Sequence, residues 1–163
     1  MNYSTADLCD SHELDLHVVE SMFHAFGRLR AFDGPIATVK CYEDNSKVRE
    51  ALEEPGGGRI LVVDGGGSQR RALLGDRLGE LAVKNGWKGV VINGCVRDSE
   101  ALDKLAIGVR ALGTIPLSSQ KRGDGQRDVS VSFAGVTFRP GAHLYADADG
   151  IVVTARSLES ATE

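Results

Sequence analysis

The chain has 163 residues, of which 42% are hydrophobic and 26% are charged, with a formal net charge of −4 and a sequence pI of about 5.6. This balance is ordinary for a globular protein and excludes a disordered or collagen-like chain. An acidic chain lacks the positive field of a nucleic-acid-binding protein, so no direct nucleic-acid ligand is expected. We expect a single domain over residues 1–163, large enough to bury a core.

The N-terminal segment lacks the basic start and apolar run of a signal peptide, and no stretch reaches the length of a membrane span. We therefore expect a cytoplasmic protein that does not associate with a membrane. The three cysteines are far apart and form no Cys-x-x-Cys pair, so they are expected to be reduced and mostly buried. The histidines show no metal-ligand spacing and are expected to be structural or exposed. These residues are Cys9, Cys41, Cys95, His12, His17, His24 and His143.

The first third of the chain mixes helical and extended patterns. Residues 4–11 predict a short helix with Ser4 or Thr5 as its N-cap. Apolar residues between 19 and 26 follow helical spacing, although β-branched residues and a closing glycine leave a strand as the alternative. Two further elements are expected, a strand over 36–41 and a helix around 48–52.

The middle of the chain predicts a β-α-β-α-β unit. Three apolar runs are typical of strands buried on both faces, and two segments with helical spacing separate them. This alternation favours parallel strands with right-handed crossovers. The expected strands are 60–63, 89–92 and 109–115, and the helices carry Leu78, Leu81 and Ala82, then Ala101, Leu102 and Leu105.

The last quarter has a different character, because a polar, glycine-rich loop at 121–126 leads into short strands separated by turn residues. Those strands are expected at 129–133, 136–138 and 150–153, with a hairpin turn at Ala134-Gly135. The sequence therefore predicts an α/β fold in which a central β-α-β-α-β unit is joined to C-terminal antiparallel strands.

A glycine-rich turn, Asp64-Gly65-Gly66-Gly67, follows the first strand of that unit. It fits neither the Gly-x-Gly-x-x-Gly spacing of dinucleotide-binding loops nor the Lys-Ser/Thr ending of a phosphate loop. Binding of a methyl-donor cofactor rests on this turn alone. The alternative is a backbone that needs positive φ or a close approach to another segment.

Two polar segments each open a helix, and the second of them follows a buried strand directly. Gly75-Asp76-Arg77-Leu78 opens the first of these helices. Its backbone N–H groups suit a substrate carboxylate, although Asp76 could be a plain N-cap. A cation in the first turn of a helix is disfavoured, so Arg97 requires an anionic partner. Asp98 beside it could hold a divalent cation or cap the helix.

The chain resembles the regulator of ribonuclease activity A family nearly end to end. This resemblance implies a swivelling β/β/α domain and ring-shaped homotrimers with sites near the subunit boundaries. Some members are divalent-metal 4-hydroxy-4-methyl-2-oxoglutarate aldolases, and others bind and inhibit endoribonuclease E. The segments that carry the resemblance are 8–10, 39–41, 44–45, 61–68, 71–73, 135–138 and 143–147.

Aldolase members carry an Arg-Asp pair about twenty residues after a Gly-Asp turn, and twenty residues separate Asp76 from Arg97 here. The resemblance implies that residues 75–78 hold the pyruvyl carboxylate through backbone N–H groups. It also implies that Arg97 contacts the keto or enolate oxygen and that Asp98 positions Mg²⁺ or Mn²⁺. The family usually has an acid three residues after this aspartate, where Ala101 stands, while Glu100 lies one position earlier.

The favoured hypothesis is a metal-dependent aldolase that also decarboxylates oxaloacetate, because both reactions pass through the enolate of pyruvate. Asp76 is the candidate base for the 4-hydroxyl proton. No lysine is convincingly placed for a Schiff base, which favours the metal route. The alternative is a non-catalytic inhibitor of endoribonuclease E, and a methyltransferase ranks third.

Overall fold

The computed structural model describes residues 2–158. Most strands join one large sheet in the order β1-β12-β11-β3-β4-β6-β7-β2, with β5 beside β6 and β8 beside β3. The described elements are α1 (Thr5–His12), β1 (Leu16–Val18), β2 (His24–Phe26), β3 (Phe32–Lys40), α2 (Ser46–Leu52), β4 (Ile60–Asp64), β5 (Ala72–Leu74), α3 (Asp76–Lys84), β6 (Gly89–Val96), α4 (Ser99–Leu102), β7 (Gly108–Thr114), β8 (Gln126–Arg127), β9 (Val131–Phe133), β10 (Val136–Phe138), β11 (His143–Ala146) and β12 (Ile151–Thr154).

The centre of the sheet is parallel. Strands β3, β4, β6 and β7 run in one direction, and β5 runs parallel to β6. The strands β11, β12 and β1 continue the sheet antiparallel on one side, and β2 closes it antiparallel on the other. This arrangement confirms the predicted α/β fold class, with its central β-α-β-α-β unit and antiparallel C-terminal strands.

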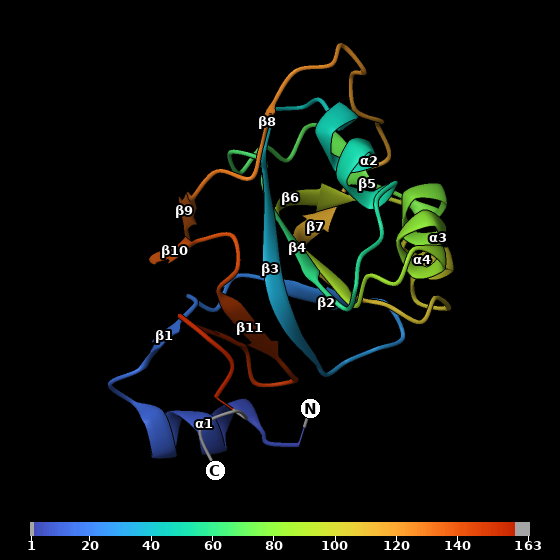
Figure 1. Ribbon diagram of the computed structural model, residues 1–163. Helices are drawn as coiled ribbons and strands as arrows, with labels where there is room; N and C mark the ends of the chain where they lie inside the picture. Colours follow the sequence, from blue (N-terminus) through green and yellow to red (C-terminus); the bar gives the residue numbers. More distant parts are fainter. Residues whose placement is uncertain (1, 159–163) are drawn as a thin grey trace.

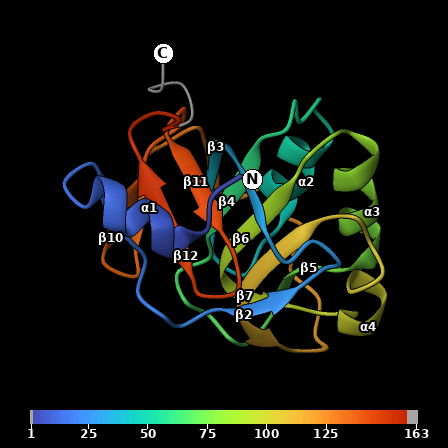
Figure 2. The ribbon, with the colours of Figure 1, turned by 90° about the horizontal axis from the view of Figure 1, so that it is seen from below.

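The two faces of the sheet have separate cores. Leu61 and Val63 pack in the cluster with α2, α3 and α4, whereas Ile60 and Val62 pack in the cluster with β9, β10 and β11. All four side chains are fully buried, since successive residues of a strand point to opposite faces. The three helices gather on one side of the sheet (Figures 1 and 2). Burial on both sides explains why residues 60–63 are continuously apolar.

The N-terminal region confirms one prediction and corrects another. Helix α1 begins where expected, because the Ser4 Oγ accepts a hydrogen bond from the Asp7 N–H at 3.1 Å. The helix predicted over 19–26 is wrong. The Val19 N–H donates to the Ile151 carbonyl of β12, and the Glu20 N–H donates to the Ala134 carbonyl in the turn between β9 and β10. Residues 24–26 form β2, an edge strand against β7. Pairing with distant segments outweighs the local helical spacing, and the strand alternative holds for residues 24–26.

Other elements differ from the prediction in length or were missed. Helix α4 ends at Leu102, three residues before the expected Leu105, and β3 begins at Phe32 rather than after Pro35. The short strands β1, β5 and β8 had no distinct sequence signal, and neither did the fully buried β11. None of the helices within residues 2–158 is long and apolar enough to cross a membrane.

A packing contact inside the sheet gives a stability prediction. Gly89 and Gly108 are paired neighbours on β6 and β7, and a Cβ on either would overlap the Phe32 ring. We expect Gly108→Ala to lower the free energy of unfolding by about 1–3 kcal/mol, because overpacking forces the core apart. Urea unfolding measures this change.

The matched control is Gly113→Ala on the same strand, where an added Cβ meets no atom within 4 Å. We expect its effect on stability to stay within about 0.5 kcal/mol. Equal effects of the two substitutions would contradict the packing of Phe32 against the glycine pair.

Candidate active site

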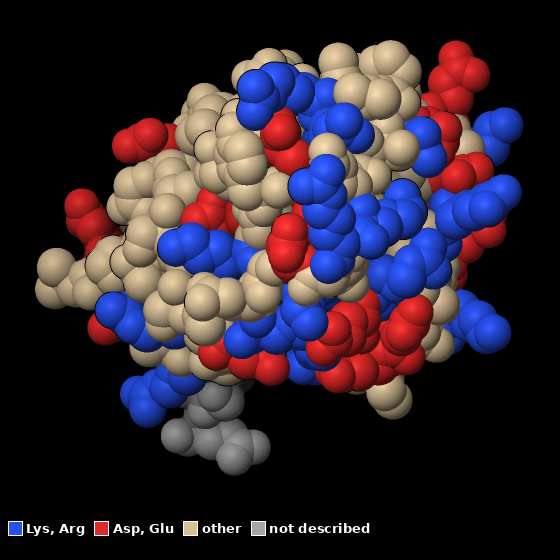
Figure 3. All heavy atoms as spheres, turned by 90° about the horizontal axis from the view of Figure 1, so that it is seen from above, with Lys and Arg blue, Asp and Glu red and all other residues tan. Residues whose placement is uncertain are grey.

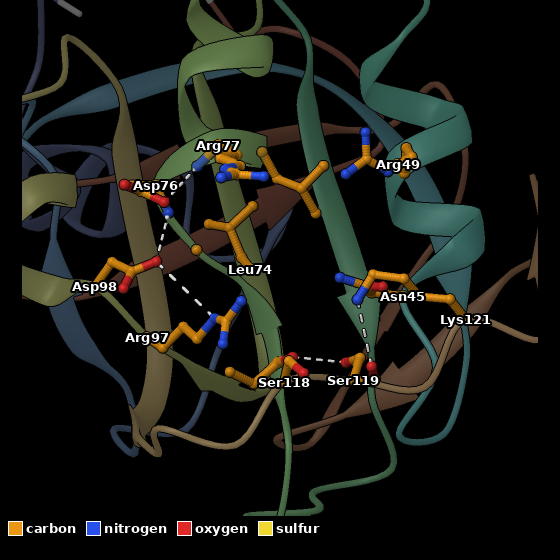
Figure 4. A pocket seen from close by; sticks show the side chains of 13 residues that line it. Asn45, Arg49, Leu74, Asp76, Arg77, Arg97, Asp98, Ser118, Ser119 and Lys121 are labelled. Carbon is orange, nitrogen blue, oxygen red and sulfur yellow. Dashed lines mark hydrogen bonds and ion pairs between the residues drawn. The ribbon is translucent and has the colours of Figure 1, made fainter.

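A pocket of about 520 Å³ lies where the carboxyl ends of β5 and β6 meet. The start of α3 follows β5 directly, and Arg97 and Asp98 follow β6. Segments after β3 and β7 complete the wall (Figure 4). The lining residues are Asn45, Arg49, Ala72, Leu74, Gly75, Asp76, Arg77, Leu78, Arg97, Asp98, Ser118, Ser119 and Lys121.

The structure brings together every predicted site residue. Gly75, Asp76, Arg77 and Leu78 come from the N-terminus of α3, and Arg97-Asp98 from the end of β6. Parallel neighbouring strands present their carboxyl ends at the same edge of the sheet, which explains the convergence. Glu100, whose role the sequence left open, is not among the lining residues.

Asp98 occupies a special position between the strand and the helix. Its φ of 54° and ψ of 43° place it in the left-handed region, which costs a non-glycine residue roughly 1 kcal/mol. Its Oδ2 accepts a hydrogen bond from the Asp76 N–H at 3.1 Å and lies 3.9 Å from the Arg97 Nε. Asp98 stands at the N-cap position of α4, as the alternative expected, but its side chain makes no capping hydrogen bond there and is bonded to the start of α3 instead.

Glycine at position 75 makes this contact possible. A Cβ there would lie 2.7 Å from the Asp98 Oδ2 and 3.3 Å from the Arg97 Cγ. Any larger residue would push the Asp98 carboxylate away from the helix start. Gly75 is therefore required for close approach, and its φ of −133° shows that backbone freedom is not the reason.

The start of α3 already holds carboxylates in this structure. The Asp98 carboxylate accepts from the Asp76 N–H, and the Asp76 Oδ1 accepts from the Arg77 N–H at 2.8 Å. Two of the N–H groups predicted to hold substrate are thus hydrogen-bonded to side chains. The same contacts show that this helix start accepts carboxylate oxygens, as the helix dipole favours.

The sequence did not predict five polar lining residues. Asn45 donates to the Leu73 carbonyl at 3.3 Å, and the Ser119 Oγ donates to the Ala72 carbonyl at 2.6 Å, so both tie distant segments to β5. Lys121 lies in the polar, glycine-rich loop at 121–126, for which the sequence predicted no function, and Arg49 lies in the predicted helix around 48–52 without any feature that marks it as functional. The five residues are Asn45, Arg49, Ser118, Ser119 and Lys121.

The pocket is positively charged in an acidic chain. Four of its lining residues are cations and two are carboxylates, whereas the whole chain carries a net charge of −4. Figure 3 shows the molecule from above, on the side where α2 lies in Figure 1, and Lys and Arg side chains gather on this face. A positive, concave site favours a small anionic ligand.

The number and type of metal-binding side chains in the pocket indicate which metal ion it suits. Asp76 and Asp98 are the acidic residues of the lining, and no cluster of three His, Cys, Asp or Glu occurs within residues 2–158. Mg²⁺ and Mn²⁺ accept one or two carboxylates and complete their shell with water and substrate oxygens. The donor set fits such a cation and offers no thiolate or imidazole of the kind that Zn²⁺ favours.

The glycine-rich turn at 64–67 lies outside this pocket and uses its N–H groups internally. The N–H groups of Gly65 and Gly67 donate to the Asn93 carbonyl, each at 3.1 Å, and that of Gly66 donates to the Asp64 Oδ1 at 2.9 Å. The turn therefore offers few donors to a phosphate or a methyl-donor cofactor. Its positive φ values at Gly66 and Gly67 agree with the conformational explanation.

Comparison with known proteins places the chain in a family. The RraA-like family model, described as Aldolase/RraA, matches residues 5–153. The chain belongs to the RraA-like family. A relative from Alkalilimnicola ehrlichii is 58% identical over 161 residues, covering 99% of this chain and 100% of the relative. A relative from Pseudomonas aeruginosa is 52% identical and covers 98% of both. The names of both propose 4-hydroxy-4-methyl-2-oxoglutarate aldolase activity.

Two solved structures are similar along almost the whole chain. One, from Geobacillus kaustophilus, is described as an S-adenosylmethionine:2-dimethylmenaquinone methyltransferase, with a TM-score of 0.95 and 52% identity over 97% of this chain and 98% of that chain. The other is the RNA-processing inhibitor RraA from Thermus thermophilus, with a TM-score of 0.92 and 42% identity over 96% and 94%. These likenesses confirm the expected fold.

The cysteines give a prediction about reactivity. Burial, reinforced by the nearby Asp44 and Asp64 carboxylates, raises the pKa of the Cys41 thiol to about 12, and burial also raises the pKa of Cys95. Because the thiolate is the nucleophile, both thiols should be inert at pH 8. A thiol reagent should modify the half-buried Cys9 in the native protein, and all three cysteines in denaturant. Mass spectrometry that finds rapid native labelling of Cys41 would contradict this prediction.

Proposed function

We propose that this protein is a divalent-metal-dependent aldolase that cleaves 4-hydroxy-4-methyl-2-oxoglutarate to pyruvate and also decarboxylates oxaloacetate. The main support is structural: Arg97, Asp98 and the N-terminus of α3 lie together in one positively charged pocket. The names of close relatives support the same activity.

Substrate binding uses the α3 N-terminus and Arg97. The N–H groups at the start of α3 bind the pyruvyl carboxylate beside the Asp98 carboxylate, which keeps its hydrogen bond from the Asp76 N–H. The guanidinium of Arg97 offers a planar pair of donors to the 2-oxo oxygen. Its side chain is 43% exposed and lines the pocket, so a ligand can reach it.

Bond cleavage generates negative charge at one oxygen. When the C3–C4 bond breaks, its electron pair moves toward the 2-oxo group and leaves the enolate of pyruvate, which then takes a proton at C3. Arg97 stabilises that developing charge. Asp98 would hold the divalent cation, which would supply Lewis-acid stabilisation of the enolate. Loss of carbon dioxide from oxaloacetate leaves the same enolate.

Asp76 is the proposed base that removes the proton from the 4-hydroxyl group, directly or through a water. Its Oδ1 accepts a hydrogen bond from the Arg77 N–H at 2.8 Å, which orients the carboxylate at the rim of the pocket. A general base must lie within reach of the proton that it removes, and this carboxylate lines the pocket.

A second candidate function is inhibition of endoribonuclease E by direct binding. The observation that favours it is the 42% identity to the RNA-processing inhibitor RraA. Binding to the endoribonuclease needs no catalytic pocket, so one protein can have both functions. Assembly as a homotrimer, which the family resemblance implies, and a cytoplasmic location, which the N-terminal segment and the separated cysteines favour, are also part of this proposal.

The methyltransferase hypothesis is less well supported, because the N–H groups of the glycine-rich turn are used within the chain. Calorimetric titration with S-adenosylmethionine tests it directly, and saturable binding would restore it.

The role of Asp98 gives the first functional prediction. Asp98→Ala removes the carboxylate proposed to hold the cation, so turnover of 4-hydroxy-4-methyl-2-oxoglutarate with Mg²⁺ should fall by about 100-fold or more. Coupled assay of pyruvate release measures this change, with size-exclusion elution as the control for assembly. Retained turnover in a correctly assembled variant would contradict the metal assignment.

The role of Arg97 gives the second functional prediction. Arg97→Lys keeps the charge but replaces the planar pair of donors with a point charge, so kcat/KM should fall about 10–100-fold. Steady-state kinetics on both substrates measures this loss. Near-normal kinetics would assign Arg97 a structural role through its 3.5 Å hydrogen bond to the Pro116 carbonyl.

A further inference from the structure

The pocket holds cations on two separate walls. Arg97 stands on one wall with Asp98 and the start of α3, where the pyruvyl end of the substrate is proposed to bind. Arg49 from α2 and Lys121 from the segment after β7 stand on the other wall (Figure 4). The proposed reaction at the 2-oxo group does not use this second pair.

Arg49 makes no ion pair within residues 2–158, a property that it shares with Arg77 of the same pocket. No carboxylate of the described residues lies within 4 Å of its guanidinium, whereas Arg70 and Arg127 are held by Glu43 and Glu54. Its place in the last turn of α2 suits the helix dipole. The dipole accounts for a positive charge at this position, but the direction of the side chain toward the pocket needs a different reason.

Lys121 has a similar environment. Its Nζ donates one hydrogen bond, to the Ser119 carbonyl at 3.4 Å, and an ammonium group has three donors. The segment that carries it is fixed beside the pocket, since the Ser119 Oγ donates to the Ala72 carbonyl. Two cations without carboxylate partners therefore face the pocket from the side opposite Arg97.

We propose that Arg49, assisted by Lys121, is the specificity-determining residue that binds the second carboxylate of a dianionic 2-oxo acid. This inference rests on the proposed function of the same pocket. The charges of the pocket agree with this inference. The two carboxylates, Asp76 and Asp98, neutralise a divalent cation, so the positive charge of the four lining Lys and Arg residues is left to attract an anionic substrate. A monoanionic 2-oxo acid with a methyl group at its far end leaves Arg49 and Lys121 without a partner.

Binding measurements separate this inference from catalysis. The probes are 2-oxoglutarate and 2-oxopentanoate, which share the 2-oxo acid end and differ in a carboxylate or a methyl group at the other. Isothermal titration calorimetry with Mg²⁺ gives their affinities for wild type, Arg49→Gln, Lys121→Gln and the double variant. The matched control is Arg139→Gln, an exposed arginine that does not line this pocket.

Wild type should bind 2-oxoglutarate about 10-fold more tightly than 2-oxopentanoate, since a charge-assisted hydrogen bond contributes that much. Arg49→Gln should lose most of this preference and the double variant all of it, with 2-oxopentanoate affinity unchanged. The control should keep the wild-type preference.

Equal wild-type affinity for the two probes, or a preference that survives in the double variant, would overturn the inference and leave the 2-oxo acid site intact. Binding of neither probe would overturn the proposed function of the pocket together with the inference.

Discussion

The hydrogen bond from the Asp76 N–H to the Asp98 carboxylate joins the two chain segments on which the candidate site depends. It brings the end of β6 against the start of α3, and it requires both glycine at position 75 and a left-handed backbone at Asp98. Such strain at a non-glycine residue is typical of functional positions. Anion-binding donors, a cation and a carboxylate are thereby held within one pocket.

The parallel sheet explains why the polar and charged residues of the candidate site lie together in this pocket. Strands β4 and β6 are buried on both faces and are almost entirely apolar, and the one polar side chain inside β6, Asn93, donates a hydrogen bond to Asp64 at the end of β4. The polar residues that follow β5 and β6 meet at one edge of the sheet, where the pocket is positive although the chain is acidic. A local positive field in a negative protein selects small anions and disfavours polyanions such as nucleic acid.

The sequence predicted the residues of one wall because each follows an apolar run and opens a helix. Residues 75–78 and Arg97-Asp98 are visible in this way, and the family resemblance gave them roles. Arg49 and Lys121 carried no such signal, since α2 and the segment after β7 meet the pocket only in three dimensions. The segment at 19–26 was mispredicted for the same reason, because hydrogen bonds to distant strands determine its conformation.

We propose above all that this pocket stabilises the enolate of pyruvate. Proton exchange at C3 of pyruvate in D₂O, followed by NMR, tests it without an aldol substrate. We expect metal-dependent exchange with the wild-type protein that is absent after chelation. Exchange no faster than in a solution of the metal alone would contradict it.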